Sequence, residues 1–189
     1  LIETLMMKIL MVCLGNICRS PLAEGLMRQK LNKFHIDGEV NSCGFESFHI
    51  GDSPDYRSIQ VASAHGVDIT QHRGIQFKPS FFDYYDRIYV MDRHNYMDVI
   101  SKARNENDKK KVDFIMNAVY PGKNAAVPDP YYGQISDFEK TWELLDMATE
   151  KIAESMRTSA NNLYNLLENL LSWSEMQRGR IPFNPTRFN

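Results

Sequence analysis

A cysteine and an arginine with five residues between them stand near the start of the chain, in the stretch "VCLGNICRSPLAEG" (12–25). A cysteine thiolate is a strong nucleophile, and the planar guanidinium of arginine binds two phosphate oxygens at once. Their spacing in one short loop therefore predicts attack of Cys13 on a phosphorus atom, with Arg19 holding the phosphoryl group as charge develops.

Two regular elements must position this loop. The apolar run at 8–14 predicts a buried strand, and Ser20 followed by Pro21 predicts the N-cap and first turn of a helix. A loop that leads into a helix N-terminus points unpaired N–H groups at an anion, and these groups also lower the pKa of a nearby thiol below about 8.5. Gly15 is expected to help the loop curl by adopting a positive φ. The expected phosphate-binding residues are Leu14, Gly15, Asn16, Ile17, Cys18 and Ser20.

An aspartate between two prolines offers the proton donor that such a reaction needs. Asp129, in "VPDPYYG" (127–133), follows the last expected strand and should share the carboxyl edge of the sheet with Cys13. We expect this carboxyl group to protonate the leaving oxygen and then to activate water for hydrolysis of the phosphocysteine.

Strand-length apolar runs alternate with helical segments along the chain, which predicts an α/β fold with parallel strands. Strands are expected at 8–14, 39–45, 87–91 and 112–119. Further helices are expected at 53–65 and 92–103, and the charged stretch 105–111 reads as a solvated connection. Residues 134–178 lack glycine and proline and predict one long helix, or two helices broken near "TSANN" (158–162), whose apolar stripe from Phe138 to Leu170 covers the sheet.

Length and composition restrict the class of protein. A chain of 189 residues with net charge −2 and pI near 6.2 suits one domain, with no general attraction to nucleic acid or an anionic membrane. Residues 1–11 lack a secretory pattern, and the three cysteines are expected to be reduced thiols, so a cytoplasmic protein is predicted. Neither zinc-ligand spacing nor the phosphate-loop pattern G-x4-G-K-[ST] is present, which predicts chemistry without a metal or cofactor.

The chain resembles the low-molecular-weight protein tyrosine phosphatases. "VCLGNICRSPLAEG" is similar to the signature loop of that family, "DPYYG" (129–133) to its general-acid loop, and "FDYYDRIYVMD" (82–92) to its third strand. The resemblance runs from about Met7 to about Thr158. It implies a Rossmann-like phosphotyrosine phosphatase I fold, a three-layer open sandwich with a four-stranded parallel sheet flanked by helices.

The resemblance also implies roles for individual residues. Cys13 would be the nucleophile, Arg19 the phosphate clamp, and Asp129 the general acid and then base. Residues that support the loop would be Asn16, Ser20, Ser42 and His72, and the walls that hold a substrate ring would be Phe48 and Tyr131. Cys18 matches a second loop cysteine, which in the family can form a reversible disulfide with the nucleophile.

The chain departs from the family pattern at three places. Cys43 and Phe45 replace small residues, which should alter packing near the second strand. Residues 1–158 form the expected phosphatase domain, with the first six read as an extension, and 159–189 form a helical C-terminal extension of the same domain. Three roles remain open for this C-terminal extension: packing on the core, self-association, or contact with a partner.

The expected activity is metal-independent hydrolysis of protein phosphotyrosine or a small aryl phosphate, by a monomer or weak homodimer that binds neither nucleic acid nor membrane. Arsenate reductases of the same fold share the loop, but they use two further cysteines where residues 80–100 contain none. Protein-arginine phosphatases carry threonine where this chain has Ile17. A non-catalytic phosphopeptide-binding module is the alternative from another class, and the retained Cys13 and Asp129 argue against it.

Overall fold

The computed structural model describes residues 6–177. The expectations for residues 1–5 and 178–189 lie outside this range. The chain divides into two compact units, Leu1–Ala153 and Glu154–Asn189. Within the described range, no helix is both long and apolar enough to cross a membrane.

Four parallel strands form the sheet of the first unit, as the alternating pattern predicts. They are β1 (Met7–Cys13), β2 (Gly38–Gly44), β3 (Arg87–Val90) and β4 (Val112–Phe114), in the spatial order β2-β1-β3-β4. The chain leaves β1 for β2 on one side and returns to β3 on the other. The carboxyl end of β1 therefore lies at the point where the winding direction reverses, the usual ligand site of an open α/β sheet.

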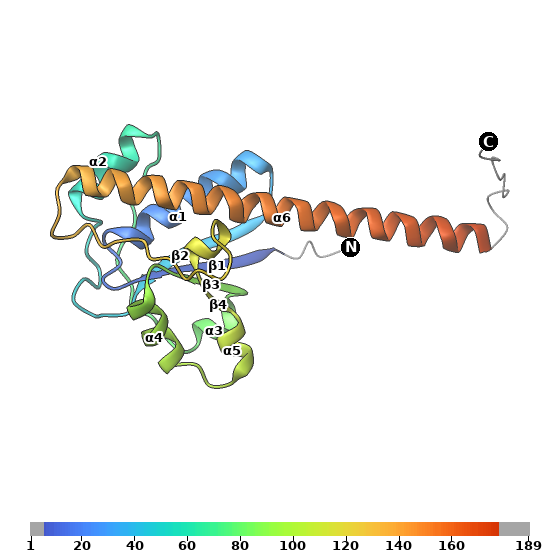
Figure 1. The fold of residues 1–189 in the computed structure, drawn as a ribbon, viewed down its shortest axis with the longest axis horizontal. Coiled ribbons are helices and arrows are strands. Elements are labelled where there is room, and N and C mark those ends of the chain that lie inside the picture. Colours follow the sequence, from blue (N-terminus) through green and yellow to red (C-terminus); the bar gives the residue numbers. More distant parts are fainter. Residues whose placement is uncertain (1–5, 178–189) are drawn as a thin grey trace. The chain divides into compact units, whose positions relative to one another are not determined.

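Helices cover both faces of this sheet (Figure 1). They are α1 (Arg19–Phe34), α2 (Tyr56–Ala64), α3 (Phe81–Tyr84), α4 (Arg93–Ser101), α5 (Glu106–Lys110), the 3-10 helix η1 (Ile115–Ala118) and α6 (Ile135–Gln177). Within the first unit, α1 and the start of α6 lie on one face and α3, α4 and α5 on the other, which confirms the predicted three layers. Asp92 caps α4 as expected, with its Oδ1 accepting the N–H of Asn95 at 2.8 Å.

Two expected elements differ in the structure. The strand predicted at 112–119 ends at Phe114, and Ile115 and Met116 lie in η1 with at most 1% of their surface exposed. Their apolar character therefore reflects burial of a turn rather than continued pairing of a strand.

The stretch expected as a solvated connection contains the short helix α5. The Oδ1 atom of Asn105 accepts the N–H of Asp108 at 3.0 Å, and buried Asp108 binds the Nε atom of Arg104 at 2.8 Å. This charged stretch forms a helix because Asn105 caps its first turn and Asp108 forms an ion pair with Arg104.

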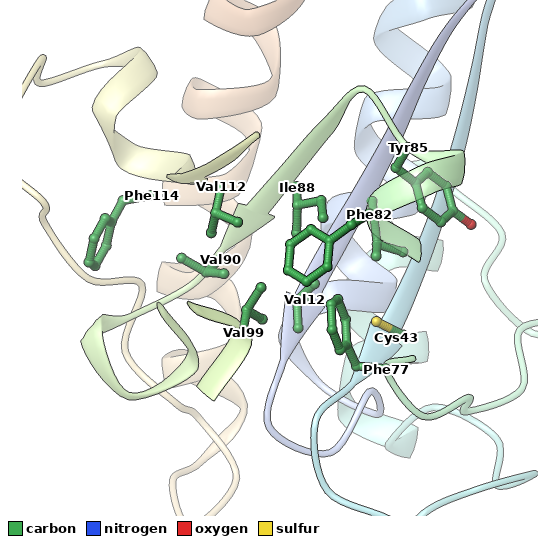
Figure 2. Packing of buried hydrophobic residues seen from close by; sticks show 11 residues of the cluster. Val12, Cys43, Phe77, Phe82, Tyr85, Ile88, Val90, Val99, Val112 and Phe114 are labelled. Atoms are coloured by element: carbon green, nitrogen blue, oxygen red, sulfur yellow. The ribbon is translucent and has the colours of Figure 1, made fainter. Parts of the chain in front are cut away.

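The side of the sheet that faces α3 and α4 is packed mainly by aromatic and β-branched side chains (Figure 2). The buried cluster comprises Leu10, Val12, Cys43, Phe77, Phe82, Tyr85, Ile88, Val90, Val99, Val112 and Phe114. Cys43 is fully buried here, and the ring of Phe45 stacks on Phe77 with 6.3 Å between centroids. Cys43 and Phe45, the two residues that depart from the family pattern, thus both pack in the cluster that contains Phe77.

The opposite side is covered by the first part of α6, which is one helix through the "TSANN" stretch. Phe138, Trp142, Leu145 and Ile152 are at most 5% exposed, as the predicted stripe requires. The same prediction is wrong for the end of the stripe, because Leu163, Leu167 and Leu170 are 59%, 49% and 54% exposed. These leucines belong to the second unit, where no described side chain buries them.

Candidate active site

The loop between β1 and α1 is held by the end of β2 and the start of α2. The N–H groups of Phe45 and Glu46 donate to the carbonyl oxygens of Cys13 and Leu14 at 3.0 and 2.9 Å. Gly44 passes so close to the loop that a Cβ atom there would lie 2.9 Å from the oxygen of Leu14. A side chain at Gly44 would therefore displace the loop.

Cys13 ends β1 with its sulfur turned into the loop. Its Sγ atom accepts the N–H of Asn16 at 3.2 Å and lies 3.0 Å from the Oγ atom of Ser20. The residue is 2% exposed, yet it lines a pocket of about 350 Å³. The thiol is therefore oriented by its neighbours and reachable through that pocket.

Asn16, and not Gly15, adopts the left-handed conformation that curls the loop. Its φ is 58°, whereas Gly15 is not among the glycines with positive φ, so the role predicted for Gly15 is wrong. Asparagine tolerates this region because its side chain bonds locally. Here Nδ2 donates to the Oγ atoms of Ser20 and Ser42 at 2.8 and 2.9 Å, and Oδ1 accepts the N–H of Ile75 at 3.0 Å.

Ser20 does not cap α1, contrary to the sequence prediction. The helix begins at Arg19, and its N-cap residue, Cys18, makes no side-chain capping bond. The Oγ atom of Ser20 instead accepts a hydrogen bond from Nδ2 of Asn16 and lies 3.0 Å from the sulfur of Cys13. Ser20 and Asn16 therefore support the loop from behind and do not line the pocket.

Glu24 completes this support and was missed from the sequence. Its Oε2 atom accepts the hydroxyl of Ser42 at 2.6 Å and lies 3.3 Å from Nδ1 of His72, so His72 is connected to the loop through Glu24. Burial raises the pKa of Glu24, but hydrogen bonds from His72 and Ser42 outweigh that effect and lower the pKa from its usual value. Its position four residues after Ser20, hence on the same face of α1, was the signal available in the sequence.

Arg19 lies between two carboxylates. Its Nη1 atom donates to Asp92 at 2.5 Å, its Nη2 atom donates to Asp129 at 2.6 Å, and the residue is 2% exposed. Burial lowers the pKa of the guanidinium, but the charges of Cys13, Asp129 and Asp92 outweigh burial and raise it. The buried Nε atom has no hydrogen-bond partner among the described residues, which leaves a donor free for an anion. The sequence does not predict that Asp92 holds Arg19, because the expected cap of α4 already explains an aspartate at this position.

The pocket brings together residues that are far apart in the sequence. It is lined by Cys13, Leu14, Gly15, Ile17, Cys18, Arg19, Glu46, Phe48, His49, Asp129, Tyr131 and Tyr132. Both predicted wall residues are present, with Phe48 79% and Tyr131 40% exposed, and Tyr132 packs edge-on against Tyr131. His49 also lines the pocket, with its ring centroid 6.4 Å from that of Tyr131.

The second loop cysteine stays a neutral thiol in this environment. Cys18 is a free, buried thiol whose pKa is raised by burial and then by the negative charge of Asp55. Cys43 is also free, and complete burial raises its pKa well above the ordinary value. Cys13 and Cys18 are both free thiols and line the same pocket. The reversible disulfide between them that the resemblance implies stays a prediction.

A family model described as "Low molecular weight phosphotyrosine protein phosphatase" matches residues 8–162 of this chain. The chain belongs to this family. The match confirms the resemblance stated from the sequence, and it identifies the protein as an enzyme of the protein tyrosine phosphatase class.

Named relatives of the phosphatase extend from yeast to vertebrates. The low molecular weight phosphotyrosine protein phosphatase of Saccharomyces cerevisiae is 36% identical over 143 residues, which cover 73% of this chain and 88% of the yeast protein. The chicken protein of the same name is 34% identical over 137 residues, covering 71% and 86% of the two chains.

Solved structures agree with the fold of the phosphatase. A protein tyrosine phosphatase from Entamoeba histolytica with Hepes in its active site matches with a TM-score of 0.76 at 31% identity, covering 82% of this chain and 99% of the other. Vibrio vulnificus Wzb in complex with benzylphosphonate matches with a TM-score of 0.71 at 28% identity, covering 79% and 99%. The predicted four-stranded parallel α/β fold is thereby confirmed.

Proposed function

We propose that this phosphatase hydrolyses protein phosphotyrosine through a covalent phosphocysteine on Cys13, without a metal ion or other cofactor. The observation that carries the proposal is the meeting of three groups at one pocket: the sulfur of Cys13, the guanidinium of Arg19 and the carboxylate of Asp129. The free Nε donor of Arg19 and the loop amides supply the positive environment that a phosphate dianion needs.

In the first step, the sulfur of Cys13 attacks phosphorus and a sulfur–phosphorus bond forms. The bond from phosphorus to the tyrosine oxygen breaks, and the departing phenoxide takes a proton from the carboxyl group of Asp129. Arg19 stabilises the equatorial oxygens in the transition state. Asp129 accepts a hydrogen bond from Arg19, and phosphate oxygens that reach this guanidinium would replace the carboxylate of Asp129 and free that carboxylate to face the leaving group.

In the second step, Asp129, now a carboxylate because it gave up its proton, takes a proton from a water molecule. The oxygen of that water attacks phosphorus, the sulfur–phosphorus bond breaks, and inorganic phosphate and the thiolate of Cys13 are released. The Oγ atom of Ser20, 3.0 Å from the sulfur, is placed to stabilise the thiolate as it leaves.

The depth of the pocket favours an aryl phosphate over an alkyl phosphate. Cys13 is 2% exposed, while the ring of Phe48 at the pocket wall is 79% exposed, so the phosphate must enter well below the surface. A phosphotyrosine side chain carries its phosphate on a long, flat ring that fits between aromatic walls. The side chain of phosphoserine is shorter and offers no ring to those walls.

Release of phosphate from phosphotyrosine peptides and p-nitrophenyl phosphate, with and without EDTA, tests the proposal. Cys13→Ser should lose turnover by several orders of magnitude, because serine is a poor nucleophile without an adjacent base, and it should still bind phosphate or vanadate. Turnover retained by Cys13→Ser, or lost with EDTA in the native protein, would refute the mechanism.

Asp129→Asn tests the proton donor in the same assay. The variant should slow the release of poor leaving groups by about 100-fold to 10,000-fold and that of good ones much less, since only poor leaving groups need the proton. An equal effect on all leaving groups would remove Asp129 from this role. A phosphoarginine peptide, tested in parallel, separates the proposed activity from that of a protein-arginine phosphatase.

A further inference from the structure

The second unit presents a row of large apolar side chains that its own residues leave uncovered. Seven such side chains between 163 and 173 are 49–65% exposed: Leu163, Tyr164, Leu166, Leu167, Leu170, Leu171 and Trp173. Isolated apolar residues on a surface are ordinary, but a contiguous group on one short segment indicates an interaction surface.

The spacing of these residues is that of a helix packed along one face. Leu163, Leu166, Leu167 and Leu170 follow the pattern i, i+3, i+4, i+7, and Trp173 continues it three residues further. The same periodicity runs through the first part of α6, where Phe138, Trp142 and Leu145 are buried. We call the five residues Leu163, Leu166, Leu167, Leu170 and Trp173 the exposed stripe.

The segment depends on packing for its stability as a helix. Asn161, Asn162, Asn165 and Asn169 all fall within it, and asparagine is a poor helix former. Helices in proteins gain most of their stability by burying an apolar face. A partner that covers the exposed stripe would supply that burial.

The charges of the segment restrict what the partner can be. Glu168 and Glu175 are the only charged residues between 158 and 177. Each follows a stripe leucine by five positions, which sets it about 140° around the helix at 3.6 residues per turn. Helices that lie on anionic membranes carry lysine or arginine on their polar face, and this segment carries none. A stripe without charge is complementary to itself and opposes no like charges in a symmetric pair.

We propose that residues 158–177 of two copies of this chain pair through the exposed stripe and form a homodimer. The spacing of the leucines suits the knobs-into-holes packing of paired helices. In such a pair the same surface is used by both copies, so one substitution in the stripe changes both sides of the interface.

Sedimentation velocity of the full chain over a range of concentrations tests this proposal. The native protein should approach twice the monomer mass of 21.9 kDa as concentration rises. The double variant Leu163→Glu with Leu170→Glu should weaken dimerisation about 100-fold or more, because like charges then meet in an apolar interface. The matched control, Asn161→Glu with Asn165→Glu, adds the same charge to the polar face and should dimerise like the native protein. Thermal unfolding of each variant shows whether the phosphatase domain is intact.

Crosslinking gives a second readout, in which dimerisation produces a new covalent product. Leu167→Cys, near the middle of the exposed stripe, should form an intermolecular disulfide under mild oxidation, whereas Asn165→Cys on the polar face should not. A native protein that stays monomeric at all concentrations would overturn the proposal. So would a dimer that both double variants leave unchanged, or a monomeric native protein that binds neutral lipid vesicles through the stripe.

Discussion

The three cysteines illustrate how differently one residue type behaves in three surroundings. Cys13 lines the pocket and receives a hydrogen bond from Asn16, whereas Cys43 is sealed in the core beside Phe77. Cys18 shares one property with each of them. It lines the pocket as Cys13 does, but burial and the charge of Asp55 raise the pKa of its thiol, as burial does for Cys43. Reactivity with electrophiles requires both access and a thiolate, so only Cys13 has the position of a nucleophile.

Alkylation with iodoacetamide at neutral pH should therefore modify one cysteine. We expect Cys13 to be labelled, and Cys18 and Cys43 to react at least about 10-fold more slowly because their raised pKa values keep them protonated. Peptide mass spectrometry after partial labelling measures the three rates. Inorganic phosphate should protect Cys13 and no other site, and preferential labelling of Cys18 would contradict this assignment.

At the scale of elements, the loop conformation is set by residues on α1, on β2 and near residue 72. Asn16 bonds Ser42 of β2, Ser42 bonds Glu24 of α1, and Glu24 receives His72. Each link is buried and charged or polar, so breaking one leaves its partners without their bonds. The loop between β1 and α1 thus depends on Glu24, a side chain that does not line the pocket.

Glu24→Gln should destabilise the protein at neutral pH by roughly 1–3 kcal/mol, the usual cost of a disturbed buried polar network. The lowered pKa of Glu24 means that its stabilising contribution is present above the unfolded value near 4.5 and is lost as pH falls through the folded value. The difference between native and variant free energies of unfolding should therefore shrink in acid. Urea unfolding from neutral pH to below 4.5 measures it, and a difference independent of pH would show that the charge of Glu24 contributes nothing.

The sequence predicts the elements that obey one periodicity and misses those set by tertiary contacts. Continuous apolar runs located β1 and β3 to within one residue, and the cap at Asp92 located α4. The start of α1 was misassigned because the hydroxyl of Ser20 serves the loop, and Gly15 was given a conformation that Asn16 adopts. Such choices depend on which partner a polar side chain finds across the fold, and spacing along the chain carries no information about it.

At the scale of the whole molecule, the long helix α6 has two different environments along its length. Residues up to Ala153 belong to the first unit, where Phe138 is fully buried and the guanidinium of Arg57 lies 4.4 Å from its ring centroid. Arg57 in turn donates to the carbonyl oxygens of Tyr131 and Gly133, in the same short loop as Asp129. The start of α6 is therefore part of the support for Asp129.

Matched truncations on α6 should separate these two environments. Phe138→Ala should lower the free energy of unfolding by about 3–5 kcal/mol, because it removes a fully buried ring and leaves a cavity. Leu163→Ala, at protein concentrations where the chain is monomeric, should change that free energy by less than about 0.5 kcal/mol, since its side chain is 59% exposed. Urea unfolding followed by tryptophan fluorescence measures both. An equal loss in the two variants would mean that the side chain of Leu163 is buried in the monomer, contrary to its observed exposure.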